Sequence, residues 1–319
     1  MISYVFFVLL VLLTIFGMFG NLMVIIAIGG DRKMRKAAMN ILLINLAVAD
    51  LLNLIILSIE WSQVIIFGRN IWILPGFLCP IVRYLECLFL FSSIMTQLIV
   101  CVERYVAIVY PMQVRRVCSV KNILIAISIM WLCVFLVSLP NAFCNRKRSI
   151  KIGQDTITRC SNRSIASIYW YLYKWVEFLS FYLIPCIIII VLYCQISKVL
   201  WTNNKLLQEG KCFYSKINYR CSTAKVFKSR SDTVTMRRSV VKMLVTCVSV
   251  YFVCYSPIQF LFLFITVFKY KVRVPFSFRL CMNVLALTCS ACNPLLYTLF
   301  SKKFRSKILN LLPNKISMK

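Results

Sequence analysis

The chain has 319 residues, of which 61% are hydrophobic and 15% are charged, and its mean hydropathy is +0.82. This composition excludes a soluble domain, which needs far more polar surface, and it indicates a membrane protein. The formal net charge of +29 is scattered over the loops at both ends of the apolar segments. That distribution argues against a nucleic-acid partner and favours contact with anionic membrane lipid.

Seven apolar segments are long enough to cross a bilayer, which takes about 20 residues of helix. They lie at 3–28, 40–66, 77–110, 122–141, 170–199, 238–268 and 278–300. None of them alternates apolar and polar residues as a barrel strand does, so we expect helices. The sequence therefore predicts an all-α membrane protein built as a seven-transmembrane helix bundle.

Lysine and arginine are distributed unevenly between the two sets of connecting segments. The segments after spans one, three, five and seven are the richer set, with eleven basic residues from Lys198 to Lys242 and six from Lys302 to Lys319. Positive charge favours the cytoplasmic side of a membrane. We therefore expect a multi-pass protein of the plasma membrane with an extracellular N-terminus and a cytoplasmic C-terminus.

The third span carries polar side chains along its whole length. Glu86, Ser93, Gln97 and Arg104 recur at intervals of seven, four and seven residues, so they share one face of a helix. Polar groups within a membrane are costly and usually face the bundle interior. Hydrogen bonds between helices would account for one pair of such groups, but a seam that continues to Asp50 on span two indicates a functional role.

The longest predicted outer loop carries three signals. Cys160 in this loop and Cys79 at the outer start of span three both lie on the oxidising side, where a disulfide persists, and Cys144 competes as a partner for either. Asn162 starts the triplet Asn-Arg-Ser, which is a glycosylation sequon or a chance match. The stretch KRSIKIGQDTITRC alternates on either side of 153–155, which predicts a β-hairpin that ends at Cys160.

Each span also carries a short sequence motif. The motifs are GNLMV with Asn21, NLAVAD with Asp50, Glu103-Arg104-Tyr105, Trp131, Pro185 with Tyr193, CYSP with Pro257, and Asn293-Pro294-Leu295-Leu296-Tyr297. With these motifs in order, the chain resembles the rhodopsin-like G-protein-coupled receptors, and in particular the peptide receptors, over essentially its whole length. Cys79 lies 25 residues before Arg104, so the resemblance also implies a disulfide between Cys79 and Cys160.

The resemblance implies a switch at the cytoplasmic end of span three. In such receptors at rest a glutamate neutralises the neighbouring arginine, and activation releases that arginine toward a heterotrimeric G-protein. Glu103 and Arg104 match these two positions. A lone guanidinium at the membrane edge is costly, so a partner that can leave it creates a two-state element. The other residues implied in coupling and activation are Tyr105, Tyr193, Tyr255, Pro257, Asn293, Pro294 and Tyr297.

The chain departs from the family pattern at several of these places. Tyr255 stands where most members have tryptophan, and Arg237 and Arg238 lie where some receptors carry an acid that holds the switch arginine. We therefore expect appreciable signalling without ligand. Cys289 replaces a common asparagine, which weakens the sodium site that the resemblance implies. Its residues are Asp50, Ser93, Ser290 and Asn293. We expect no other cofactor, no metal centre and no enzyme activity, because the chain has no histidine and its thiols lack a general base.

Polar side chains near the outer face are the candidate ligand contacts. They are Glu60, Arg83, Glu86, Lys174, Glu177, Gln259 and Arg279. Buried carboxylates favour a cationic group on the ligand, and the alternative is internal pairing of Glu86 with Arg83 and of Glu177 with Lys174. The predicted hairpin is typical of peptide receptors, so a neuropeptide or peptide hormone is the favoured ligand.

Several other functions stay open. Glu86 matches the position at which amine receptors bind the ligand amine, so a biogenic amine receptor is one alternative. A constitutively active receptor and a chemokine-like receptor are others. A transporter or channel would also hold polar groups at middle depth, but we find no inverted repeats or glycine-broken spans, and the chain has only 8 glycines.

The segment after span seven predicts a short amphipathic cytoplasmic eighth helix. Phe304, Ile308, Leu311 and Leu312 recur at helical spacing among basic residues, which suits a helix lying on the inner leaflet. We thus expect a receptor domain at 1–300 and this helix with a short tail at 301–319. Serines and threonines in the third inner loop, about 200–237, are candidate sites for a receptor kinase, with arrestin as a further partner.

Overall fold

The protein is described by a computed structural model. It covers residues 2–67, 71–152, 155–162, 167–199, 242, 245–246, 248–261, 263–264, 275–300 and 305–306, without the side chains of 2–3, 150, 152, 155 and 296–300. The predicted third inner loop, including Arg237 and Arg238, lies outside these residues. The predicted tail at 301–319 does too, apart from Arg305 and Ser306.

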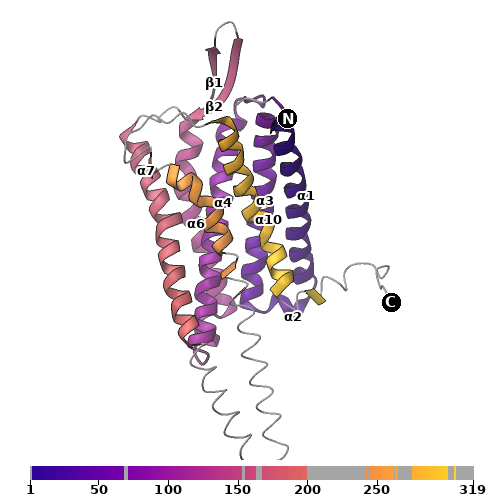
Figure 1. The fold of residues 1–319 in the computed structure, drawn as a ribbon. Helices are drawn as coiled ribbons and strands as arrows, with labels where there is room; N and C mark the ends of the chain where they lie inside the picture. Colours follow the sequence, from indigo (N-terminus) through magenta and orange to yellow (C-terminus); the bar gives the residue numbers. More distant parts are fainter. Residues whose placement is uncertain are drawn as a thin grey trace, which may run out of the picture.

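Long helices packed side by side form a bundle (Figure 1). In chain order they are α1 (Ile2–Gly29), α3 (Ala38–Ile66), α4 (Leu78–Val109), α6 (Val120–Cys144), the helix Ile168–Val199, the helix Val248–Leu261 and α10 (Phe276–Phe300). The helix Ile168–Val199 starts with α7 (Ile168–Phe178). Short turns of helix, α2 (Arg32–Arg35) and α5 (Val114–Val117), lie between long ones.

The helices match the predicted spans closely. Within the described residues, five of them are apolar and long enough to cross a membrane, at Tyr4–Gly29, Ala38–Ile66, Leu78–Val109, Val120–Cys144 and Ile168–Val199. The fourth span is the main correction, because α6 continues past Pro140 to Cys144 instead of ending at 141. A proline removes one backbone donor, and here the helix continues for another turn. Asn145 then donates its side chain to the carbonyl of Asn141.

The helix Ile168–Val199 contains an irregular turn that the sequence does not predict. Its residues Leu179–Leu183 form the π-helical turn η1, just before Pro185. A π turn shifts the backbone hydrogen bonds and leaves a carbonyl available to other donors. The carbonyl of Phe181 accepts a hydrogen bond from the Tyr251 hydroxyl at 2.8 Å, so this turn ties the fifth predicted span to the sixth.

Small and polar residues hold the helices together. Gly17 on α1 lies against Leu54 and Ala291, and Trp131 on α6 donates its Nε1 to Asn45 at 2.9 Å. Asn45 in turn donates to Thr96 on α4 at 2.7 Å. Because lipid offers no hydrophobic drive for helices to associate, close approach at glycine and interhelical hydrogen bonds stabilise the bundle.

The predicted β-hairpin is confirmed. β1 (Asn145–Ile152) and β2 (Asp155–Asn162) pair antiparallel from Asn145 opposite Asn162 to Ile152 opposite Asp155, so β2 continues two residues beyond Cys160. Figure 1 shows the hairpin projecting from one end of the bundle, here called the hairpin end. The opposite end, which carries Arg104, is called the Arg104 end.

The hairpin is fastened to the bundle at several points. A disulfide joins Cys79 at the start of α4 to Cys160, with Cα atoms 5.6 Å apart, while Cys144 stays a free thiol. The backbone N–H of Trp72 donates to Thr158 at 2.8 Å, and the Thr158 hydroxyl donates back to the Trp72 carbonyl. These contacts hold the hairpin over the helix ends.

Candidate functional site

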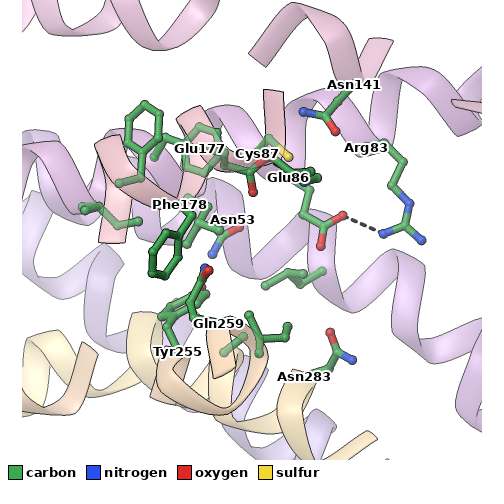
Figure 2. A pocket seen from close by; sticks show the side chains of 18 of the residues that line it. Asn53, Arg83, Glu86, Cys87, Asn141, Glu177, Phe178, Tyr255, Gln259 and Asn283 are labelled. Atoms are coloured by element: carbon green, nitrogen blue, oxygen red, sulfur yellow. Dashed lines mark hydrogen bonds and ion pairs between the residues drawn. The ribbon is translucent and has the colours of Figure 1, made fainter. Parts of the chain in front are cut away.

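A cavity of about 540 Å³ lies among the helices at the hairpin end. Its walls come from α3, α4, α6, α7, the helix Val248–Leu261 and α10, and the hairpin residues Cys160, Ser161 and Asn162 also line it. Figure 2 shows polar side chains pointing into this space from several elements, among them Asn53, Glu86, Gln259 and Asn283. Its volume lies within the range of ordinary ligand pockets.

One wall carries a connected set of charges. Arg83 on α4 contacts two carboxylates, with Nη2 2.5 Å from Glu60 Oε1 and Nη1 3.0 Å from Glu86 Oε2. Glu60 comes from α3 and is 3% exposed, whereas the Glu86 side chain is 22% exposed. The predicted pairing of Glu86 with Arg83 is therefore present, and Glu60 shares the same guanidinium.

A second ion pair lies on α7. Lys174 Nζ is 2.6 Å from Glu177 Oε2, one turn away on the same helix. The ammonium also lies over the rings of Trp170 and Tyr173, at 5.2 and 5.6 Å from their centroids. This lysine is thus held by its own helix, through the ion pair and through cation–π contacts.

Aromatic side chains form the floor of the cavity. Phe91 and Phe181 stack with ring centroids 4.0 Å apart, and Tyr251 packs on Tyr255 at 4.9 Å. All four line the cavity. Because they come from three different helices, a ligand that reaches this floor would contact groups that can move relative to one another.

Below the floor, polar residues surround a buried carboxylate. Asp50 accepts hydrogen bonds from the Ser93 hydroxyl at 2.8 Å and from the Asn293 amide at 2.6 Å. Asn53 donates to the Ser290 hydroxyl at 3.2 Å, and its buried Oδ1 finds no hydrogen-bond partner in the described part of the chain. Among the described residues, no lysine or arginine pairs with Asp50. The predicted sodium residues thus gather in one place, with an additional free oxygen from Asn53.

That set of oxygens fits a small hard cation. Asp50 supplies the negative charge, the hydroxyls of Ser93 and Ser290 supply neutral oxygens, and Asn53 Oδ1 lacks a donor. Hard cations take carboxylate, amide and hydroxyl oxygens. The residues present are therefore chemically suited to sodium, as the sequence predicts.

At the Arg104 end, Glu103 and Arg104 form an ion pair. Arg104 Nη2 donates to Glu103 Oε1 at 2.6 Å, and its Nε donates to Oε2 of the same carboxylate. Glu103 is 5% exposed and Arg104 is 22% exposed. The Tyr193 hydroxyl lies 3.5 Å from the Sγ of Cys101, two residues before Glu103. The arginine is therefore neutralised by its neighbour, as the resting state predicted from the sequence requires.

Comparison with known proteins agrees with this arrangement. Residues 20–297 match the model of the rhodopsin family of 7 transmembrane receptors. The chain belongs to this family. It is therefore a multi-pass receptor and not an enzyme, and the family fold supplies the seven-helix bundle.

Several receptors with named ligand classes are similar to this one. Neuropeptide receptor 15 of Caenorhabditis elegans is 48% identical over 313 residues, which cover 95% of this chain and 88% of that protein. The thyrotropin-releasing hormone receptor of Gallus gallus is 28% identical and the allatostatin-A receptor of Bombyx mori 27%, and each alignment covers 91% of this chain and 74% of the relative.

Some predicted ligand contacts of the receptor need correction. Arg279 is exposed near the start of α10 and is not among the residues that line the cavity. Glu60 is buried behind Arg83 and does not line it either. Arg83 and Lys174 line the cavity, and each is paired with carboxylates of the receptor. Glu86, Glu177 and Gln259 do line the cavity.

The structure also locates several residues predicted to act in activation, and the predicted glycosylation site. Pro257 is half-buried and Pro294 buried in their helices, and the Tyr105 ring packs on Tyr110 with centroids 5.9 Å apart. The side chain of Tyr297 is outside the described part of the chain. Asn162 lines the cavity and its amide nitrogen is buried, so a glycan there would require this side chain to turn outward. Glycosylation of Asn162 stays a prediction.

Sequence reasoning missed several residues of the receptor's cavity. Asn53, Cys87, Asn141 and Phe181 line it. Asn53 lies one helical turn after Asp50, so its position on the polar face was a usable signal. For Phe181 no signal exists, because an aromatic residue that faces the cavity and one that faces lipid look alike in an apolar span.

Proposed function

We propose that the receptor binds an extracellular neuropeptide or peptide hormone and activates a heterotrimeric G-protein. The observation that carries this proposal is the layout of α4, which holds Glu86 at a charged cavity under the hairpin and the paired Arg104 at its other end. The two residues are 18 positions apart, or about 27 Å along a helix. One helix thus links a site for ligand to a site for G-protein.

The proposal implies an orientation. The hairpin end, with its disulfide, faces the extracellular space, and the Arg104 end faces the cytoplasm of a cell whose plasma membrane holds the receptor. The basic segments predicted on the inner side support this orientation. They also supply positive charge for contact with lipid headgroups there.

Signal transfer starts at the aromatic floor. A ligand that presses on Phe91, Phe181 or Tyr255 shifts the helices that carry these rings against one another. Helix shifts of this kind let a packed, two-state core report ligand binding at a distance. Released from Glu103, the Arg104 guanidinium is then free to bind the G-protein, with Tyr193, Asn293 and Tyr297 supporting the active state.

Sodium is the proposed allosteric modulator of this switch. Asp50, Ser93, Ser290 and Asn293 would hold the ion, with Asn53 Oδ1 as an additional oxygen. A bound cation supplies positive charge beside the buried Asp50 carboxylate. Because Asp50 and Asn293 come from α3 and α10, the ion stabilises the packing of these helices in the resting state.

Two partners and one property complete the proposal. A receptor kinase and arrestin act on the third inner loop, while Arg237 and Arg238 weaken the resting state and give basal signalling. Cells that express the receptor should show second-messenger levels above those of mock-transfected cells. Equal levels would contradict the basal signalling.

A biogenic amine receptor is the second candidate, because Glu86 matches the amine-binding position and lines the cavity. The structure supports it less well, since Glu86 is already paired with Arg83. The relatives named for peptides, above all the 48% identical one, also favour a peptide. A chemokine-like ligand has no observation in its favour.

The test is a G-protein activation assay in cells that express the receptor at the surface. A library of neuropeptides and biogenic amines is applied to the wild type, to Arg104→Ala and to Arg35→Ala, a control that removes an exposed arginine from α2. A peptide response that Arg104→Ala abolishes and Arg35→Ala retains supports the proposal. An amine response would favour the second candidate, and silence toward every compound would overturn both.

A further inference from the structure

One guanidinium neutralises two carboxylates from two helices at the edge of the cavity. Arg83 contacts Glu60 on α3 at 2.5 Å and Glu86 on α4 at 3.0 Å. When both are ionised, the two carboxylates carry two negative charges, against the single positive charge of Arg83. Glu60 Oε2 is buried and has no hydrogen-bond partner among the described residues. In that part of the chain, the cluster therefore contains a carboxylate oxygen that no donor satisfies.

The other charges of the cavity wall do not compensate this cluster. Lys174 is paired with Glu177 and lies over two rings of its own helix, so this pair is neutral by itself. Among the described residues, the remaining polar side chains that line the cavity are neutral, such as Asn141, Gln259 and Asn283. With Glu60 ionised, it and the described lining residues sum to a surplus of one negative charge. Buried charge without a partner is costly, which favours a cationic ligand.

The two carboxylates differ in access. Glu60 is 3% exposed and does not line the cavity, whereas Glu86 is 22% exposed and does. Figure 2 shows the Glu86 carboxylate between Arg83 and the middle of the cavity. A cation from the cavity therefore meets Glu86 first. Arg83 keeps a partner when Glu86 leaves it, because Glu60 stays behind.

We propose that a basic residue of the peptide ligand binds Glu86 and displaces it from Arg83, which remains on Glu60. After the exchange each carboxylate has one cation. This inference rests on the proposed peptide ligand and names its recognised group, a guanidinium or an ammonium. Glu60 acts as a positioning residue, since it touches no ligand but keeps Arg83 from competing for Glu86.

Charge variants distinguish this exchange from simple attraction. Glu60→Gln leaves Arg83 and Glu86 as a neutral pair, so a cation must then compete with Arg83. Binding of a cationic ligand should therefore weaken by about tenfold or more, and a tenfold change corresponds to about 1.4 kcal/mol. Arg83→Gln removes the competitor and should tighten binding. Glu86→Gln should abolish binding, and Asp31→Asn at the start of α2 is the control with the same change in net charge outside the cavity lining.

The experiment measures thermal unfolding of the purified, full-length receptor with two probes. N-acetyl-arginine amide carries one positive charge, and N-acetyl-citrulline amide is a neutral analogue of nearly the same shape. A ligand that binds only the folded state raises the melting temperature according to its affinity. At constant chloride concentration the arginine probe should raise the melting temperature in the wild type and in Asp31→Asn, weakly in Glu60→Gln and not in Glu86→Gln. The citrulline probe should leave it unchanged.

Three results would overturn the inference. The first is an equal effect of the two probes, and the second is no effect of the arginine probe on the wild type. The third is an unchanged affinity of Glu60→Gln for the arginine probe, which would mean that Glu60 is protonated and uncharged. Should Arg83→Gln fail to fold, Glu60→Gln still decides the question. A cellular response to peptides without basic residues, unchanged in Glu86→Gln, would remove this subsite and leave the peptide function intact.

Discussion

Replacing Gly17 by alanine should separate α1 from its neighbours. A Cβ atom at this position would lie 2.7 Å from Leu54 Cδ1, 2.8 Å from Ala291 Cβ and 3.0 Å from Ala291 Cα. Unstrained carbon contacts are about 3.5 to 4.0 Å, so the helices must move apart by about 1 Å. Leu54 can rotate away, but Ala291 presents its backbone, so α1 has to shift away from α10.

The cost follows from two opposing terms. Overpacking typically costs about 1 to 3 kcal/mol. Alanine recovers about 1 kcal/mol of helix propensity relative to glycine. The net effect on the free energy of unfolding should be a loss of up to about 2 kcal/mol. Gly29→Ala is the matched control, because a Cβ there has no heavy atom within 4 Å in the described structure, and it should cost nothing.

Thermal unfolding of the detergent-solubilised receptor measures the difference. Gly17→Ala should melt below the wild type, and Gly29→Ala should not. If Gly17→Ala melted at or above the temperature of Gly29→Ala, the close approach of α1 to α3 and α10 would not be the reason for glycine at this position.

Four further variants, one of them a control, test contacts between helices and loops by the same melting assay. Tyr251→Phe removes the hydroxyl that bonds the π turn and should cost about 0.5 to 1.5 kcal/mol. Tyr255→Phe, which keeps that bond, should cost less, and the reverse order would contradict the role of the bond. Asn45→Ala breaks the bonds to Trp131 and Thr96 and should cost about 1 to 2 kcal/mol. A melting temperature equal to that of the wild type would show that the bonds are replaced. Cys160→Ser opens the disulfide and should cost about 2 to 4 kcal/mol. Dithiothreitol should then lower the melting temperature of the wild type but not of this variant.

Much of the architecture was predictable because the bilayer restricts it. A segment that crosses hydrocarbon must be a helix of about 20 apolar residues, so hydropathy locates the spans. The hairpin was predictable for another local reason, since the alternation in 147–160 has the two-residue period of a strand. The pair of Glu103 with Arg104 was expected from the family resemblance, which the Glu103-Arg104-Tyr105 motif carries.

The candidate site was predictable only in part, and Arg83 illustrates the reason. Helical periodicity tells which face a residue occupies, but it does not say which helix packs against that face. Glu86 lies three positions from Arg83 and was a visible partner, while Glu60 on α3 became its partner only through packing. The same reason explains why the exposed position of Arg279 and the role of Phe181 were missed.

The sequence by itself determined the membrane helices, the family motifs, the hairpin and the local ion pairs, because all of these depend on residues within a few positions of one another. The tertiary structure decided which charges share a partner, which tyrosine satisfies the π turn and which oxygens gather around Asp50. Those choices depend on the order and distance of helices in the bundle. Each is set by close packing at residues such as Gly17, whose effect appears only when the neighbouring helix is in place.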